Sequence, residues 1–157
     1  TYSEGLMEYS EVEFILSENK GWNQANYEAG VRASMEKWGV AQAKVDAYVA
    51  ALPAANKENV ITQKYIALYM QPQTAWVEYR RTGYPNGSIL LLPGATGYEI
   101  DGTPYTFTPL VAGMTDIPSR IAYPLSEQTI NRANWTSAVA TYGGQDPING
   151  KLWWMTR

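Results

Sequence analysis

The sequence predicts a mainly α-helical protein with one long irregular region that carries a small β-hairpin. Apolar residues recur at helical spacing through the first half of the chain, and the breaks between these stripes are short and contain Gly or Pro. This periodicity disappears between Tyr84 and Ile117. We therefore expect one region in three parts: helices over 1–83, a loop and hairpin over 84–117, and a segment with a helix over 118–157.

Five helices are expected in the first part. The first begins with the capping-box spacing of Ser10 and Glu13 and ends at Lys20-Gly21, and Gly83 is the expected C-cap of the fifth. Short connections favour antiparallel neighbours, and consecutive helical pairs of this size resemble repeat units. The stripes are Val12, Ile15 and Leu16; Tyr27, Val31, Met35 and Trp38; Val45, Tyr48, Val49 and Leu52; Ile61, Tyr65, Leu68 and Tyr69; and Trp76, Tyr79 and Arg80.

Turn signals organise the rest of the chain. Asp101-Gly102 stands between Tyr98-Glu99-Ile100 and Tyr105-Thr106-Phe107, which predicts a hairpin. Asn86-Gly87 predicts another turn, and the last helix is expected from Asn134 to Tyr142. Loops of this length are usually functional or mobile.

Composition excludes several functional classes. The 157 residues are 45% hydrophobic, 17% charged and 13% aromatic, with a net charge of -3, so nothing favours nucleic acid as a partner. Cys and His are both absent, which excludes thiol nucleophiles, histidine triads and the usual zinc sites. No cofactor or metal is therefore expected. Asp101, Asp116 and Asp146 lie in Gly/Pro-rich loops as speculative calcium ligands, without EF-hand spacing.

The stretch "AWVEYRRTGYP" (75–85) allows two interpretations. Arg80 and Arg81 near a helix C-terminus complement the helix dipole, with Glu78 as a candidate partner that adjoins them in sequence. The alternative is a ligand site, with the arginines clamping an anion or Trp76 stacking on a sugar. We favour the structural role. Core packing is likewise favoured over ligand contact for Trp38, Tyr65 and Trp135, which lie on or beside apolar stripes.

Aromatic residues outside the periodic elements are the better ligand candidates. Sugars present apolar C–H faces that pack on aromatic rings, while their hydroxyls bond to polar side chains. Such rings can equally anchor a long loop, and the sequence leaves both interpretations open. The candidates are Trp22 in the first inter-helix loop and Tyr98, Tyr105 and Phe107 around the hairpin, with Asp101, Asn86 and Glu99 as nearby polar groups.

Five segments occur in an order that is familiar from one protein family. They are "YSEVEFILSE" (9–18), "YEAGVRASMEKWGV" (27–40), "ITQKYIALYMQPQTAWVEYRRTGYP" (61–85), "IPSRIAYPLSEQTINRANW" (117–135) and "KLWW" (151–154). Together they resemble the C-terminal part of the SusD/RagB family of Bacteroidetes outer-membrane lipoproteins, most weakly over 86–116.

The resemblance implies a helical fold with tetratricopeptide-like pairs. It also implies a surface-exposed protein that binds glycans or other nutrients without catalysis and caps a SusC-like TonB-dependent transporter. Family members begin with a lipidated Cys and further helices. We therefore expect this chain to be a C-terminal portion, with membrane association only through an anchor upstream of it.

Two other classes remain open. A helical interaction module would bind only protein through its exposed stripes. A carbohydrate-active enzyme would need two carboxylates facing one bond, and no pair in the sequence stands out.

Overall fold

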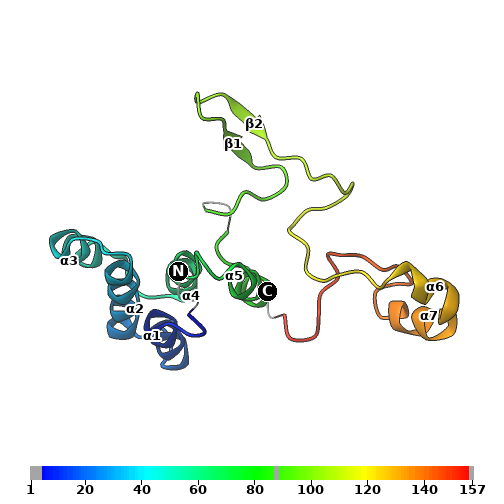
Figure 1. The fold of residues 1–157 in the computed structure, drawn as a ribbon, viewed down its shortest axis with the longest axis horizontal. Coiled ribbons are helices and arrows are strands. Elements are labelled where there is room, and N and C mark those ends of the chain that lie inside the picture. The colour runs from blue at the N-terminus through cyan, green and yellow to red at the C-terminus, as the bar shows by residue number, and fades with distance from the viewer. Residues whose placement is uncertain (1–4, 87–88, 156–157) are drawn as a thin grey trace. The chain divides into compact units, whose positions relative to one another are not determined.

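The computed structural model describes residues 5–86 and 89–155, which form two compact units. Unit 1 comprises residues 5–86 and unit 2 comprises residues 89–155; they are coloured blue to green and green to red in Figure 1. The described residues form seven helices and one two-stranded antiparallel sheet, which confirms the predicted mainly helical class. The predicted Asn86-Gly87 turn extends outside the described residues.

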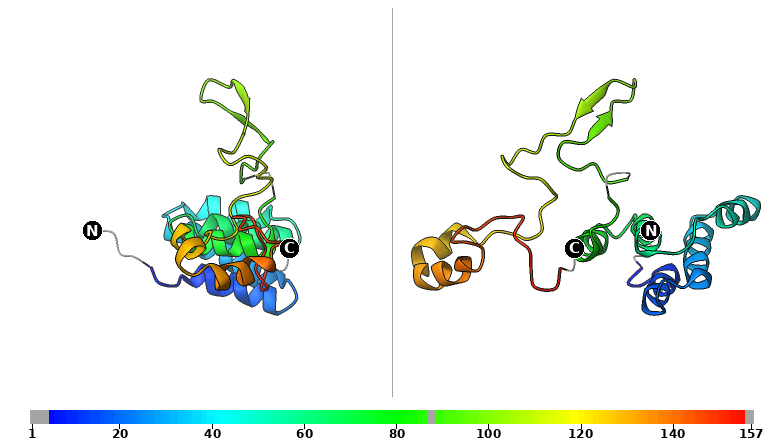
Figure 2. Two further views of the ribbon diagram at one scale, coloured as in Figure 1. Left: turned by 90° about the vertical axis from the view of Figure 1, so that its right-hand side faces the viewer. Right: turned by 180° about the vertical axis from the view of Figure 1, so that it is seen from behind.

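Unit 1 contains the five predicted helices. α1 packs on α2, α2 on α3, and α4 on α5, so helices that follow one another in the chain are neighbours in space. α4 also contacts α1 and α2, and the two further views show this group from the side and from behind (Figure 2). Their bounds are α1 Tyr9–Asn19, α2 Gln24–Lys37, α3 Gln42–Ala50, α4 Lys57–Ala67 and α5 Pro72–Thr82.

The apolar stripes meet in one core. Phe14 of α1 lies at its centre and is 1% exposed. Gly30 allows the close approach of α1 and α2, because a Cβ at this position would lie 2.9 Å from Cε1 of Phe14. The buried cluster consists of Phe14, Tyr27, Val31, Val45, Val49 and Val60.

The capping box predicted at Ser10 is wrong. The N-cap is Glu8, two residues before Ser10, so α1 begins at Tyr9 and Ser10 is buried inside the helix. Glu13 instead accepts a hydrogen bond of 2.6 Å from Nδ2 of Asn26 on α2. Ser10 and Glu13 have the spacing of a capping box, but the contact between α1 and α2 directs the Glu13 carboxylate to Asn26. At the far end of unit 1, Gly83 caps α5 with a φ of +80°, as predicted.

Unit 2 contains the hairpin and two short helices. β1 (Thr96–Tyr98) pairs with β2 (Pro104–Thr106), and α7 (Arg132–Ala140) replaces the predicted helix over 134–142 with an earlier start and end. α6 (Leu125–Ile130) was not predicted from the sequence; it is only six residues long and buries none of them.

One ion pair in unit 2 joins the two segments that flank α6 and α7. Arg120 donates from Nη1 to the carboxylate of Asp146, and its guanidinium lies 4.9 Å from the ring centres of both Tyr123 and Tyr142. Both charged side chains are less than 10% exposed. The carboxylate of Asp146 also accepts the Tyr123 N–H at 2.7 Å, so the segment before α6 is fastened to the segment after α7.

Candidate functional site

The hairpin register separates Tyr98 and Tyr105, two of the predicted ligand contacts. Tyr98 pairs with Pro104, whereas Tyr105 pairs with Gly97. Because successive side chains on a strand point to opposite faces, the two rings lie on opposite faces of the ribbon. Tyr98 is 70% exposed. Tyr105 lies across Gly97, where a Cβ would come within 2.6 Å of the Tyr105 ring. Tyr98 is therefore the more accessible of the two rings.

Asp101 has a structural task in the turn. Its Oδ1 accepts the Thr103 N–H at 2.9 Å, and this backbone hydrogen bond is the main reason that the pKa of Asp101 is lowered. Gly102 follows with a φ of +87°, a conformation that favours glycine. The Asp101 side chain is nonetheless exposed to solvent.

Phe107 and Trp22 are more enclosed than the hairpin tip. Phe107 is half-buried, and its N–H and C=O bond to Ala95 and Gly94, both at 2.9 Å. Trp22 belongs to unit 1, has a φ of +67° and packs against the helical core. The five predicted contact residues are therefore divided between the two units, with Trp22 in unit 1 and the other four in unit 2. Their role in binding stays a prediction.

The two arginines near the end of α5 are part of the scaffold. Arg81 donates from Nη1 and Nη2 to the two carboxylate oxygens of Glu18 on α1, both at 2.7 Å. Arg81 also donates to Glu78 at 2.9 Å. Glu78 was a candidate partner in the sequence, and its position three residues before Arg81 places the two side chains on the same face of α5. Lys64 approaches the same Glu78 carboxylate at 3.3 Å. The structural interpretation of Arg81 is confirmed.

This network perturbs the titration of its members. Burial raises the pKa of Glu78, but the hydrogen bond from Arg81 and the positive charges of Lys64 and Arg81 together outweigh burial and leave that pKa below its ordinary value. The hydrogen bonds that Arg81 donates to Glu18 raise the pKa of Arg81. The guanidinium of Arg80 instead stacks over the ring of Trp76, 4.1 Å from the ring centre. All of these contacts lie within unit 1 and hold its helices together.

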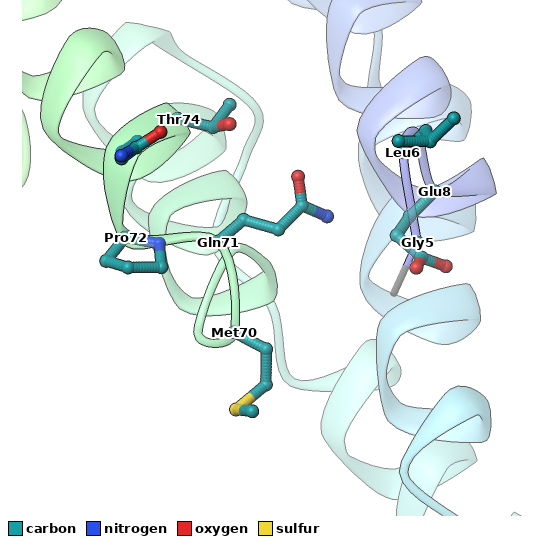
Figure 3. Close-up of a pocket in the computed structure, with 8 residues that line it drawn as sticks. Gly5, Leu6, Glu8, Met70, Gln71, Pro72 and Thr74 are labelled. Carbon is teal, nitrogen blue, oxygen red and sulfur yellow. The ribbon is translucent and has the colours of Figure 1, made fainter. Parts of the chain in front are cut away.

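A pocket in unit 1 was missed from the sequence (Figure 3). It has a volume of about 410 Å³ and lies between the segment that leads into α1 and the start of α5. Gln71 extends from the α4–α5 connection towards Leu6 and Glu8. The pocket is lined by Gly5, Leu6, Glu8, Met70, Gln71, Pro72, Gln73 and Thr74.

Two exposed rings adjoin residues that lead to this pocket: Tyr69 directly precedes the lining residue Met70, and Trp38 follows Lys37, which forms an ion pair with the lining residue Glu8. Trp38 and Tyr69 meet edge to face, with ring centres 6.1 Å apart and planes at 78°. The prediction that Trp38 packs in the core is wrong, because the side chain lies beyond the last turn of α2 and is 46% exposed. Tyr69 is 76% exposed. Tyr65 and Trp135 are half-buried, in line with packing. The sequence signal for exposure was the position of both bordering rings at the very end of a stripe.

The described residues contain neither a metal-binding cluster nor a membrane-spanning helix. Across residues 5–86 and 89–155, no three acidic residues come together in a way that would hold an ion. In the same ranges, no helix has the length and apolar character needed to cross a bilayer.

Comparison with known proteins places the chain in a family. A family model named SusD-like and described as "Starch-binding associating with outer membrane" matches residues 2–103. The chain belongs to the SusD-like family. No curated protein matches it.

Three solved structures resemble nearly all of the chain. A chitin-binding protein has a TM-score of 0.69 and 30% identity, over 95% of this chain and 33% of its own. A SusD-like protein from Bacteroidetes AC2a has a TM-score of 0.73 and 30% identity, over 97% and 30%. A SusD homologue from Bacteroides fragilis has a TM-score of 0.66 and 26% identity, over 94% of this chain and 34% of its own. The chain thus spans about a third of the length of these relatives.

Proposed function

We propose that this SusD-like chain is part of a non-catalytic surface protein that captures an oligosaccharide or a related nutrient at the outer membrane. A lipid anchor would hold the protein there, and the ligand would pass to a SusC-like TonB-dependent transporter. The observation that carries the proposal is the match of residues 2–103 to a family described as starch-binding and associated with the outer membrane. The solved relative described as chitin-binding adds a second glycan as a candidate ligand.

Among the predicted contact residues, Tyr98 is the best placed to meet a sugar. Its ring is largely exposed, and Asp101 beside it in the turn offers carboxylate oxygens to hydroxyl groups. Tyr105 and Phe107 would contribute from the other face or by fixing the hairpin. Trp22 would contribute from unit 1. Contacts of this kind are individually weak and favour moderate affinity with reversible release.

A protein-binding role is the second candidate, supported by the apolar surface of unit 2. Leu110, Ile121, Ile130 and Trp153 are each more than 85% exposed. Exposed apolar surface on this scale is typical of protein interaction sites. This candidate predicts self-association or partner binding that does not respond to glycans.

Tryptophan fluorescence of the full chain, titrated with maltoheptaose and chitohexaose, tests the proposal. Saturable quenching with both sugars recovered uncleaved supports capture without catalysis, and release of shorter sugars overturns it. Tyr98→Ala should weaken binding, whereas Tyr48→Ala removes an exposed tyrosine ring from α3, 43% exposed against 70% for Tyr98, and should leave binding unchanged. No response to either sugar, together with concentration-dependent association, favours the protein-binding role.

A further inference from the structure

We propose a second saccharide subsite in unit 1, formed by the pocket described above and its two bordering rings. We call it the Trp38–Tyr69 subsite: the pocket-lining residues Glu8, Met70, Gln71, Gln73 and Thr74 with the rings of Trp38 and Tyr69. It rests on the proposed function, since it assumes that the protein binds glycans. It differs from the predicted hairpin contacts, which lie in the other unit.

The rings and the pocket form one surface. Tyr69 directly precedes Met70, which lines the pocket. On the other side, Lys37 lies 5.3 Å from the ring centre of Trp38 and forms an ion pair of 2.8 Å with Glu8, which also lines the pocket. Both connections are within unit 1, so the rings border the pocket through neighbouring residues and an ion pair.

Tyr69 provides the stacking platform. Its ring is more exposed than that of Trp38, which is partly occupied by the ammonium of Lys37. The edge-to-face contact with Trp38 supports the Tyr69 ring and limits its rotation. A ring held in this way loses little side-chain entropy when a sugar face stacks on it.

The first turn of α5 provides the polar groups. Gln71, Gln73 and Thr74 carry amide and hydroxyl groups, and within the described part of the chain these side chains make no hydrogen bonds to protein. Amides both donate and accept, as sugar hydroxyls do. A stacking ring beside donor and acceptor groups is the combination that saccharide recognition requires.

Charge balance favours a neutral saccharide. The two ionisable side chains at the subsite, Glu8 and Lys37, neutralise each other in their ion pair. Among the described residues of the subsite, a uronic acid or a sulfated sugar would meet no unpaired cation. The volume of about 410 Å³ lies in the range of pockets that hold small ligands, and the open side permits a longer chain to continue outward.

Isothermal titration calorimetry of the full chain with maltoheptaose and chitohexaose tests the subsite. Tyr69→Ala should weaken binding by about tenfold, because it removes the apolar area on which the sugar stacks. Trp38→Ala should weaken it less, and Tyr69→Phe should bind as well as the unmodified protein. Trp153→Ala is the control, since it removes a larger and more exposed ring from unit 2 and should leave binding unchanged.

The outcomes separate the subsite from the proposed function. If the unmodified protein binds a sugar and Tyr69→Ala binds it equally well, the subsite is overturned while the proposed function stands. If the unmodified protein binds neither sugar, both fail. Tighter binding of an oligogalacturonate than of the neutral sugars would refute the neutral ligand class. Circular dichroism of Tyr69→Ala should match the unmodified protein, and a Tyr69→Phe variant as weak as Tyr69→Ala would contradict stacking.

Discussion

Replacement of Arg81 by Met should loosen the whole of unit 1. The side chain donates two parallel hydrogen bonds to Glu18 and two more to Glu78, and the pair with Glu18 links residues 63 positions apart in the sequence. Met preserves the aliphatic part of the side chain and removes the charge. After the substitution Glu78, whose side chain is 12% exposed, keeps Lys64 as its ionic partner, whereas Glu18 loses both bonds from Arg81.

The magnitude follows from the degree of burial. Breaking a buried ion pair costs about 3–5 kcal/mol, and breaking an exposed pair costs about 0.2–1 kcal/mol. The side chains of Arg81 and Glu18 are 31% and 26% exposed, so the case lies between these limits. We expect a loss of about 2–3 kcal/mol in the free energy of opening, which corresponds to roughly 30- to 150-fold faster exchange.

Hydrogen–deuterium exchange measured by mass spectrometry is the suitable assay, because it reports on each segment separately in a chain of two units. Peptides from α1 and α5 should lose protection, while those from α7 should not. Arg32→Met is the matched control: it breaks the exposed pair with Asp46 and should cost less than about 1 kcal/mol. If Arg81→Met opens α1 and α5 no faster than Arg32→Met does, the scaffold role of Arg81 is refuted.

The same network gives a pH dependence with a defined sign. The pKa of Glu78 is lower in the folded protein than its ordinary value of 4.5. A lowered carboxyl pKa contributes stability that is present above pH 4.5 and is lost as the pH falls through the lower, folded value. Exchange in α5 should therefore accelerate below pH 4.5 after correction for the intrinsic rate, and Glu78→Gln should reduce this acceleration. An equal acid response in that variant would contradict the assignment.

Three further predictions concern packing and charge. Gly30→Ala should destabilise unit 1 by about 1–3 kcal/mol through its contact with Phe14, despite the better helix propensity of Ala, and a Phe14→Leu second substitution should recover part of the loss in urea denaturation. Burial raises the pKa of Tyr27 from 10.0 to about 12. The stability that this shift contributes is present below pH 10 and should be lost as the pH rises towards 12. Absorbance at alkaline pH, compared with that of Tyr27→Phe, would reveal the late ionisation of this tyrosine. Asp146→Asn should cost about 3–5 kcal/mol in unit 2 by leaving Arg120 buried without its anion; unchanged exchange of the peptides around α7 would refute that role.

The sequence determined the local structure well because the signals are local. Helix periodicity, the Gly83 cap and the Asp101-Gly102 turn depend on residues within one or two turns of each other, and the structure contains all three. The five sequence segments and the order in which they occur also sufficed to indicate the SusD-like family. The six-residue helix α6 was missed since it buries no side chain and so leaves no apolar stripe.

Tertiary structure decided which side chains are available. Trp38 and Tyr69 continue the apolar stripes, yet both are exposed and meet each other edge to face. The pocket brings together residues 5–8 and 70–74, which are more than 60 positions apart in sequence. Strand register placed Tyr98 and Tyr105, two of the predicted ligand contacts, on opposite faces of the hairpin. The Arg81–Glu18 pair depends on α1 and α5 lying together. Periodicity gives the face of each element, but only the packing of elements determines what covers that face, and this is why the sequence alone could predict the helices and not the site.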